Sequence, residues 1–396
     1  MKRFFKSLSV VLVAVITAVS FSSASTADIF ENDMFAKSRT DRPISELPAS
    51  SVKVTNFTDA RKTAMLNIFD FNLKKESKND ESKRRYVGIG GDVFGIKLYT
   101  KGVMVIGVDF VTTDSGNVSP CAIAGVENGD IITHVNGSKV ESASQLIGAV
   151  ENSGGESLKL KVERNGKTFE LALKPELSSN GKFKAGLWVR DSSAGIGTVT
   201  FYDDKAGYFA GLGHGIYDVD TGKIMPLSNG EALKATVNGF YKSSAGNPGE
   251  LCGVFGETVL GSLRVNGDAG VISTLNASSG AELVPVARAD EVKEGAAVMV
   301  ATIDENGPQH YDVQIIKVYS SKDDSNRNMI VEITDEELLE KTGGILQGMS
   351  GAPLLKDGML IGAVTHVFVN NPTQGYAIFA ENMVQAAAET LLEKAS

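Results

Sequence analysis

The stretch of the chain that could carry chemistry is Ile345–Pro353, which reads I-L-Q-G-M-S-G-A-P. Ser350 lies here between glycines, and Gly348 and Gly351 allow the backbone to turn tightly and direct N–H groups inward. A serine hydroxyl attacks a carbonyl when a base takes its proton and N–H groups bind the oxyanion that forms. Ser350 is therefore a candidate nucleophile, and an ordinary Gly-Ser turn between strands is the alternative.

A nucleophilic serine needs a base, and the chain has four histidines: His134, His214, His310 and His366. His214 lies in G-L-G-H-G, where the neighbouring glycines leave the imidazole accessible. His310 lies in a predicted exposed loop, and the other two lie on predicted strands. His214 is therefore the candidate base, and an ordinary turn residue is the alternative.

A carboxylate would orient this base and stabilise its charged form. Asp335 precedes Ser350 by 15 residues, in a T-D-E-E sequence that predicts a capped helix over 336–341, ended by a Gly-Gly pair. Asp268 lies in N-G-D-A-G, 54 residues after His214. The residues themselves leave both aspartates open as the acid.

Composition limits the kind of protein and its partners. A chain of 396 residues predicts two or three domains, and a net charge of −9 argues against nucleic acid as the main partner. Cys121 and Cys252 lie in separate predicted domains and have no other metal ligands near them in sequence. We therefore expect no disulfide, no metal site and no cofactor.

The first residues, 1–27, predict a signal peptide or signal anchor. Basic residues begin the chain, Leu8–Phe21 is an uncharged, mostly apolar run of 14 residues, and small residues follow at 25–27. A membrane span needs about 20 apolar residues, so cleavage or transient membrane anchoring are both open. The chain beyond this segment is expected outside the cytoplasm, beginning with an N-terminal region and charged linker over 28–85.

Residues 86–175 predict one compact domain. Residues 119–137 read S-P-C-A-I-A-G-V-E-N-G-D-I-I-T-H-V-N-G, with turn signals on both sides of a strand, and a helix is expected over 142–152. This motif resembles the PDZ domains of bacterial extracytoplasmic proteases. The resemblance implies that a peptide adds as a strand beside the predicted helix. The strand that would receive the peptide contains Val103, Met104, Val105 and Ile106.

Residues 176–396 contain short strand-like segments separated by turns, which favours β-barrels or a sandwich. The G-M-S-G-A-P sequence at 348–353 resembles the nucleophile loop of chymotrypsin-like proteases. Residues 360–366 resemble their strand that pairs with substrate backbone, and 374–379 resemble the strand before their C-terminal helix. The expected fold is mainly β with some α, a PDZ domain followed by a chymotrypsin-like double β-barrel protease domain.

A closer resemblance is to the SpoIVB (stage IV sporulation protein B) serine peptidase family. It is carried by the one preceding PDZ domain and by four segments: Arg190–Asp203, Gly211–Gly222, Gly246–Glu250 and Thr342–Pro353. The resemblance implies His214 as general base, Asp335 as orienting acid and Ser350 as nucleophile. It also implies that the N–H groups of Gly348 and Ser350 form the oxyanion hole, with Gly351 leaving room for substrate.

One feature departs from ordinary chymotrypsin-like enzymes, in which the acid does not lie so close before the serine. Asp268 therefore remains the rival of Asp335 for that role.

The resemblance also implies a function. It predicts a serine endopeptidase secreted between the mother-cell and forespore membranes, which cleaves itself near its N-terminus. The enzyme would then cleave a membrane-bound regulatory protein that inhibits an intramembrane protease complex, and so activate a late sporulation sigma factor. The alternatives are a general envelope quality-control PDZ protease and a catalytically silent PDZ adaptor. The intact G-M-S-G and G-H-G motifs speak against the adaptor.

Overall fold

The computed structural model describes residues 84–319 and 326–393. The predictions for the signal segment 1–27, and for all but the last two residues of the region 28–85, lie outside the described residues. Within the described ranges, no helix is long and apolar enough to cross a membrane.

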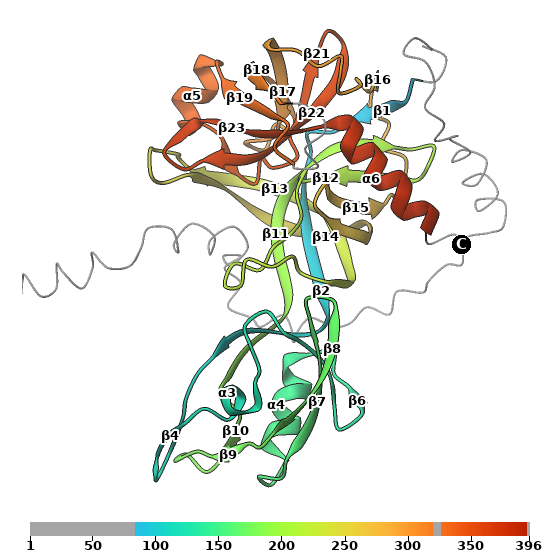
Figure 1. Ribbon diagram of the computed structural model, residues 1–396. Helices are drawn as coiled ribbons and strands as arrows, with labels where there is room; N and C mark the ends of the chain where they lie inside the picture. Colours follow the sequence, from blue (N-terminus) through green and yellow to red (C-terminus); the bar gives the residue numbers. More distant parts are fainter. Residues whose placement is uncertain (1–83, 320–325, 394–396) are drawn as a thin grey trace, which may run out of the picture.

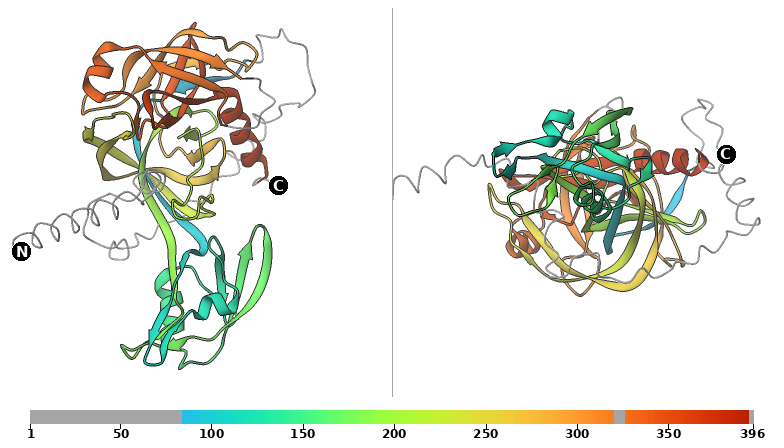
Figure 2. Two further views of the ribbon diagram at one scale, coloured as in Figure 1. Left: turned by 60° about the vertical axis from the view of Figure 1, so that its left-hand side comes forward. Right: turned by 90° about the horizontal axis from the view of Figure 1, so that it is seen from below.

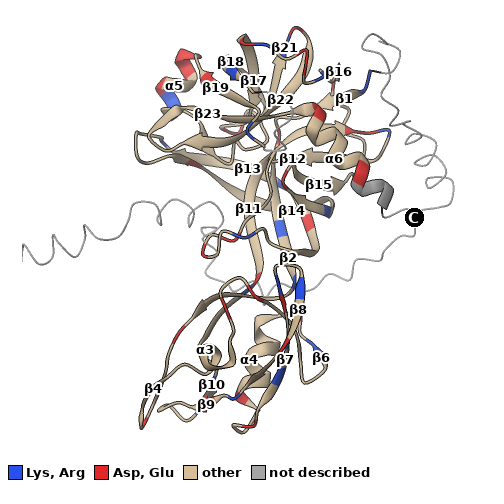
Figure 3. Cartoon of the chain, in the orientation of Figure 1, with Lys and Arg blue, Asp and Glu red and all other residues tan. Residues whose placement is uncertain are grey.

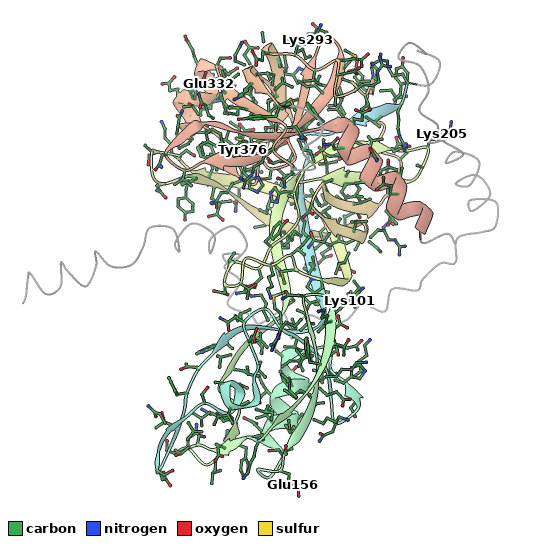
Figure 4. The ribbon with its side chains drawn as sticks, in the orientation of Figure 1. Lys101, Glu156, Lys205, Lys293, Glu332 and Tyr376 are labelled. Atoms are coloured by element: carbon green, nitrogen blue, oxygen red, sulfur yellow. The ribbon has the colours of Figure 1, made fainter. Side chains whose placement is uncertain are left out.

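Two long strands run through the whole molecule. Strand β2 (Val93–Val108) and strand β11 (Leu187–Asp203) pair antiparallel over most of their length, from Leu187 opposite Val108 to Thr198 opposite Val93. Figure 1 shows the two strands passing from the PDZ domain into the larger β structure, and Figure 2 shows the same connection from other sides. Lys101 marks the point on β2 where the two parts meet (Figure 4).

The first barrel closes around β2 and β11. Strands pair in the order β2–β11–β12–β15–β14–β13, and β13 pairs back with β2. The further bounds are β12 (Tyr208–Gly211), β13 (Leu227–Tyr241), β14 (Gly249–Gly267) and β15 (Gly270–Thr274). Strand β1 (Tyr86–Ile89) pairs with β11 and with β16 (Leu283–Pro285). Phe94 and Phe209 meet edge to face in this core, with ring centroids 5.4 Å apart.

The second barrel is a closed ring of six strands, β17–β18–β19–β23–β22–β21. Their bounds are β17 (Gly295–Ala301), β18 (Gln309–Val318), β19 (Met329–Ile333), β21 (Pro353–Lys356), β22 (Met359–Phe368) and β23 (Asn371–Phe379). Helix α5 (Glu336–Thr342) follows β19 and carries acidic residues in its first turn (Figure 3). Helix α6 (Ala380–Glu393) packs on β22 and β23. The predicted double β-barrel is confirmed.

The PDZ domain has a small core of buried aliphatic side chains between its sheet and α4. Its elements are β3 (Val111–Thr113), β4 (Gly116–Val118), α3 (Pro120–Ala124), β5 (Ile131–Val135), β6 (Ser138–Lys139), α4 (Ala143–Glu151), β7 (Leu158–Arg164), β8 (Lys167–Leu173), β9 (Glu176–Leu177) and β10 (Phe183–Lys184). Asn136-Gly137 and Asn165-Gly166 have positive φ at both residues, as two-residue hairpin turns require. These turns fix the register of the strands on either side of them.

The domain boundaries need one correction. The predicted PDZ domain, 86–175, included β1 and the first half of β2, but these segments lie in the first barrel of the protease. The PDZ domain is therefore inserted between β2 and β11 of that barrel, and does not precede the protease domain of 176–396 as a separate unit. Strand β2 passes from the barrel into the PDZ domain at Lys101-Gly102, where Gly102 has φ +82°, and strand pairing continues on both sides of this glycine.

The strand predicted to bind peptide is closed on both edges. On one side Val103 and Met104 pair with β5, and on the other Met104 and Val105 pair with Arg190 and Val189 of β11. Strand addition needs a row of unpaired N–H and C=O groups. The prediction that a peptide adds along residues 103–106 is corrected, because this chain's own β11 already occupies that edge.

The burial of Phe94 in the first barrel predicts how much this side chain contributes to the stability of the protein. Phe94 is fully buried in the first barrel, so Phe94→Ala should lower the free energy of unfolding by about 3–5 kcal/mol. Phe110, which is 66% exposed in the PDZ domain, gives the matched control, and Phe110→Ala should cost about 0.5 kcal/mol or less. Urea unfolding of the full chain measures both values. Equal losses of unfolding free energy in the two variants would contradict the burial of Phe94 in the core of the first barrel.

Candidate active site

Ser350 lies at the junction of the two barrels. Its loop connects β20 (Leu346–Gln347), which pairs in parallel with β14 of the first barrel, to β21 of the second. Tight backbone hydrogen bonds shape the loop, from Met349 N–H to the Leu346 carbonyl and from Ala352 N–H to the Met349 carbonyl. Gly351 N–H donates to the Val364 carbonyl of β22, so the loop is fastened to both barrels.

Strand β11 holds the nucleophile loop from the other side. Thr198 donates its hydroxyl to the Gly348 carbonyl (2.8 Å) and its N–H to the Ser350 carbonyl (2.9 Å). Thr200 donates its hydroxyl to the Gly351 carbonyl (2.7 Å). Both threonines are fully buried, where an unpaired hydroxyl would be costly. These three hydrogen bonds fix the loop by its carbonyl groups.

The N–H groups of Gly348 and Ser350 form no hydrogen bond with any other described residue. Gly348 has φ +95°, a conformation that a residue with a Cβ rarely adopts. The two N–H groups named as the oxyanion hole are therefore free to bind an anion, which is a requirement of that role.

Gly351 has a different purpose from the one expected. A Cβ on this residue would lie 2.0 Å from the Thr198 carbonyl oxygen and 2.4 Å from the Leu212 nitrogen. The space that glycine leaves is thus filled by the backbone of β11 and of the loop after β12, and it is not room for substrate. Gly351 lets these two segments approach the nucleophile loop.

His214 is on the loop after β12 and is buried, with 1% of its surface exposed. Its Nδ1 lies 2.7 Å from the Gly215 carbonyl oxygen. Because that oxygen can only accept, Nδ1 carries the proton of the neutral ring and Nε2 carries the lone pair. Burial lowers the pKa of His214, and the bond to Gly215 opposes part of this effect. The ring is therefore a neutral base with a bare Nε2, which forms no hydrogen bond.

Strand β22 contacts both Ser350 and His214. The Thr365 carbonyl accepts a hydrogen bond from the Ser350 hydroxyl (2.7 Å), and the next residue, His366, places its ring on His214. The two imidazole centroids are 4.6 Å apart, with 34° between the ring planes. The predicted nucleophile and base thus meet at neighbouring residues of one strand. In this arrangement the Ser350 hydroxyl donates to Thr365 and not to His214.

Neither candidate acid contacts His214. The Asp335 carboxylate is the N-cap of α5, where it accepts from Leu338 N–H (2.8 Å) and from Asp312 N–H (3.3 Å). The Asp268 carboxylate accepts from the Tyr217 hydroxyl (2.7 Å). Since Nδ1 of His214 faces Gly215 and Nε2 has no partner, no carboxylate orients the ring in this structure.

The two acids differ in their surroundings. Asp268 lies in the turn between β14 and β15, and this turn packs against the His214 loop. Asn266, next to the last residue of β14, accepts from Ile216 N–H (2.7 Å) and donates to the Ile216 carbonyl (2.9 Å). Asp335 begins a helix of the second barrel, as the capping sequence predicted. The tertiary structure therefore places the loop of Asp268 beside the base.

An ion pair fastens the loop after His214 to β11. Arg190 pairs with Asp218, which is almost fully buried, and with Asp220 (2.8 Å). Asp218 also accepts from the N–H and hydroxyl of Thr221, both at 2.9 Å. The acidic turn was visible in the sequence, but its partner lies 28 residues away and only the fold brings it there. Thr198, Thr200 and His366 likewise had no sequence signal for their roles.

In the part of the chain that the structure describes, no three His, Cys, Asp or Glu side chains converge as metal ligands do. Cys121 and Cys252 are free thiols.

Comparison with protein families gives two matches. The model described as SpoIVB peptidase S55 matches residues 181–384, over half of the chain, and a PDZ-domain model matches residues 117–164.

Curated relatives match over short segments. The zinc metalloprotease RasP of Shouchella clausii (strain KSM-K16) is 38% identical over 56 residues, which are 14% of this chain and 13% of that protein. The putative zinc metalloprotease LL2128 of Lactococcus lactis subsp. lactis (strain IL1403) is 33% identical over 84 residues, 20% of this chain and 19% of that protein. The chain thus spans less than a fifth of the length of these relatives.

Comparison with solved structures gives further matches. The PDZ domain of an SdrC-like protein from Listeria monocytogenes has 21% identity and a TM-score of 0.19, covering 22% of this chain and 87% of that one. The active form of the Rv3671c protease from M. tuberculosis has 13% identity and a TM-score of 0.29, covering 50% of this chain and 74% of that one.

The close approach at Gly351 can be tested by adding one methyl group. Gly351→Ala should destabilise the protein by more than about 4 kcal/mol, because the Cβ would clash with backbone that cannot give way. Gly358→Ala is the matched control: Gly358 also has positive φ (+74°) but open space around it, so the cost should be about 1–2 kcal/mol. Urea unfolding measures both. A Gly351→Ala variant no less stable than Gly358→Ala would refute the role assigned to Gly351.

The buried imidazole of His366 predicts a pH dependence of stability. Burial, then the neighbouring His214 and Arg327, lower its pKa to about 3. The unfolded chain takes up a proton on this residue near pH 6.5 while the folded protein does not, so protonation favours unfolding over the window from about 6.5 down to 3. His366→Phe should reduce this loss of stability, measured by urea unfolding across the window. His310→Phe, at an exposed histidine, is the control. An unchanged slope in His366→Phe would contradict the assignment.

Proposed function

Because the chain belongs to the SpoIVB peptidase S55 family, we propose that this serine peptidase acts outside the cytoplasm in sporulation signalling. In this proposal it cleaves itself near its N-terminus and then cleaves a membrane-bound regulatory protein of an intramembrane protease complex, which leads to activation of a late sigma factor. The space between mother-cell and forespore membranes is its proposed location. The expected signal segment, residues 1–27, supports export.

The observation that carries the chemistry is that Ser350 bonds to Thr365 while His214 stacks on His366, the next residue of β22. Ser350 is the proposed nucleophile and His214 the proposed general base. Far apart in sequence, they come together on the strand that resembles the substrate-pairing strand of chymotrypsin-like proteases. The free N–H groups of Gly348 and Ser350 support their assignment as the oxyanion hole.

The proposed reaction begins when substrate backbone pairs with β22. A substrate N–H would take the Thr365 carbonyl that now accepts from Ser350 (2.7 Å), so the freed hydroxyl can turn to Nε2 of His214. The Ser350 oxygen then bonds to the substrate carbonyl carbon while Nε2 takes its proton, and the oxyanion is bound by the two N–H groups. His214 returns the proton to the leaving amine as the peptide bond breaks. Water attacks the acyl-enzyme by the same steps in reverse and releases the second product.

Asp335 is the orienting acid that the family resemblance implies. It now uses its carboxylate to cap α5, whereas Nδ1 of His214 donates to Gly215, so orientation by Asp335 needs both bonds to be exchanged. Asp268 is the rival, since its loop already packs beside the base. Asp335 is the proposed acid, and replacing it by asparagine separates its charge from its role in helix capping.

Self-cleavage of the full chain tests the proposed nucleophile and base. The wild-type protein should shorten itself near the N-terminus, and Ser350→Ala and His214→Ala should each reduce the rate at least about 10³-fold. The fragments are followed by mass spectrometry. Each variant is also mixed with wild-type protein, to show that the variant chain can still be cut when an active enzyme is present. Continued self-cleavage by purified Ser350→Ala protein would disprove the assignment. Broad digestion of unfolded proteins by the wild type would favour the quality-control alternative.

The same assay decides the acid. Asp335→Asn keeps a good N-cap but removes the charge, so it should slow self-cleavage strongly if Asp335 supports the base, whereas a capping role alone would leave it active. Asp268→Asn is the matched variant at the rival position. A loss in Asp268→Asn with full activity in Asp335→Asn would transfer the role to Asp268.

A further inference from the structure

A second histidine lies against the proposed base. The His366 and His214 rings are stacked at 4.6 Å between centroids with a tilt of 34°; His214 is buried and His366 is partly buried. His366 is part of β22 of the second barrel and lies between Val364 and Val367, where the pairing of β22 with β23 shifts register. His214 comes from the first barrel. The stack is therefore a direct side-chain contact between the two halves of the site.

The contact is made by the face of the His366 ring. Nδ1 of His366 is buried and forms no hydrogen bond, and Nε2 of His214 is also buried without a partner. A side chain kept only for hydrogen bonding would not be left unsatisfied in this way. The ring face, which carries π electron density, is the part of His366 that His214 meets.

Stacking has an electrostatic consequence during the reaction. When His214 takes the serine proton it becomes a cation inside a buried site, where no carboxylate of the described residues is hydrogen-bonded to it. A neutral ring face attracts a cation placed over it, and the attraction is larger when water is excluded. His366 stays neutral at the pH at which His214 works, because burial keeps its pKa at about 3. It can therefore stabilise the charged base without repelling it.

We propose that His366 is a positioning residue for the general base: its ring fixes the plane of His214 by stacking and stabilises the imidazolium that forms in the reaction. This inference rests on the proposed role of His214 as the base. Thr365, the preceding residue, holds Ser350, so adjacent residues of β22 position the nucleophile and the base.

Other charged and titratable groups near the two stacked rings could also affect the pH dependence of the reaction. Arg327 lowers the pKa of His366. Asp268 and Tyr217 form their hydrogen bond where the turn between β14 and β15 packs on the His214 loop, and Asp218 pairs with Arg190 farther along that loop. These groups are unchanged in variants of His366, so a change in pH dependence reports on the stack.

The experiment measures the rate at which a fluorophosphonate labels Ser350 in the full-length protein, from pH 4 to pH 9. This reagent needs an activated serine and no knowledge of the natural substrate. His366→Ala should slow labelling by about 3- to 30-fold, the rate equivalent of a desolvated cation–π contact. It should also move the acid limb of the profile to higher pH, because water reaching His214 relieves the burial that lowers its pKa.

Two bulkier variants guard against a folding defect. His366→Leu keeps the site covered but has no π face, so it should be slow and its acid limb should move to lower pH, because the His214 imidazolium loses the ring that stabilises it. His366→Phe should regain most of the rate. His310→Ala is the control at an exposed histidine. The inference would be overturned if His366→Ala and His366→Leu both kept the wild-type labelling rate and the wild-type acid limb of the pH profile. It would also be overturned if His366→Phe were labelled as slowly as His366→Leu.

His214→Ala separates this inference from the proposed function. Wild-type labelling of His214→Ala would show that His214 is not the base, and both proposals would fall. Loss of labelling in His214→Ala together with unchanged His366 variants would remove only the role of His366.

Discussion

The site depends on three hydrogen bonds from β11 to the loop that carries Ser350. Thr198 and Thr200 hold the carbonyl groups of Gly348, Ser350 and Gly351 at 2.7–2.9 Å. With its carbonyls bound on this side, the loop keeps the N–H groups of Gly348 and Ser350 free. The approach is close enough that only glycine fits at position 351. The geometry needed for attack on a carbonyl is thus set by a neighbouring strand as well as by the loop's own turn.

The same strand ties the PDZ domain to the chemistry. Its first residues complete the PDZ sheet beside β2, Arg190 fastens the loop after His214, and its last residues close the first barrel. An inserted domain whose exit strand is also a barrel strand cannot move freely as a domain on a linker does. A peptide that used the edge at 103–106 would have to replace β11, and the bonds to the nucleophile loop lie only a few residues farther along that strand.

The electrostatics of this site differ from those of a triad in which a carboxylate pairs with the histidine. His214 is neutral, its proton is held by the Gly215 carbonyl, and its neighbour is a second neutral imidazole. Both candidate aspartates satisfy other donors, one at the start of α5 and one at Tyr217. Burial without a charged partner keeps the base unprotonated to lower pH, and the cation formed in the reaction must be stabilised by what surrounds the ring.

The sequence by itself determined the features that depend on local backbone chemistry. Asn-Gly pairs predicted the hairpin turns, the T-D-E-E sequence predicted α5, and glycines on both sides of Ser350 and His214 marked the two loops that meet. The PDZ and double-barrel classes followed from such signals and from resemblance. Only the tertiary structure decided that β1 and β2 belong to the first barrel, that β11 closes the edge at 103–106, and that the turn of Asp268 lies beside the His214 loop. It also decided that Gly351 makes room for Thr198 and that His366 lies on His214. These facts concern which distant strands pair, and pairing is settled by closing both barrels at once, which no single segment of the chain encodes.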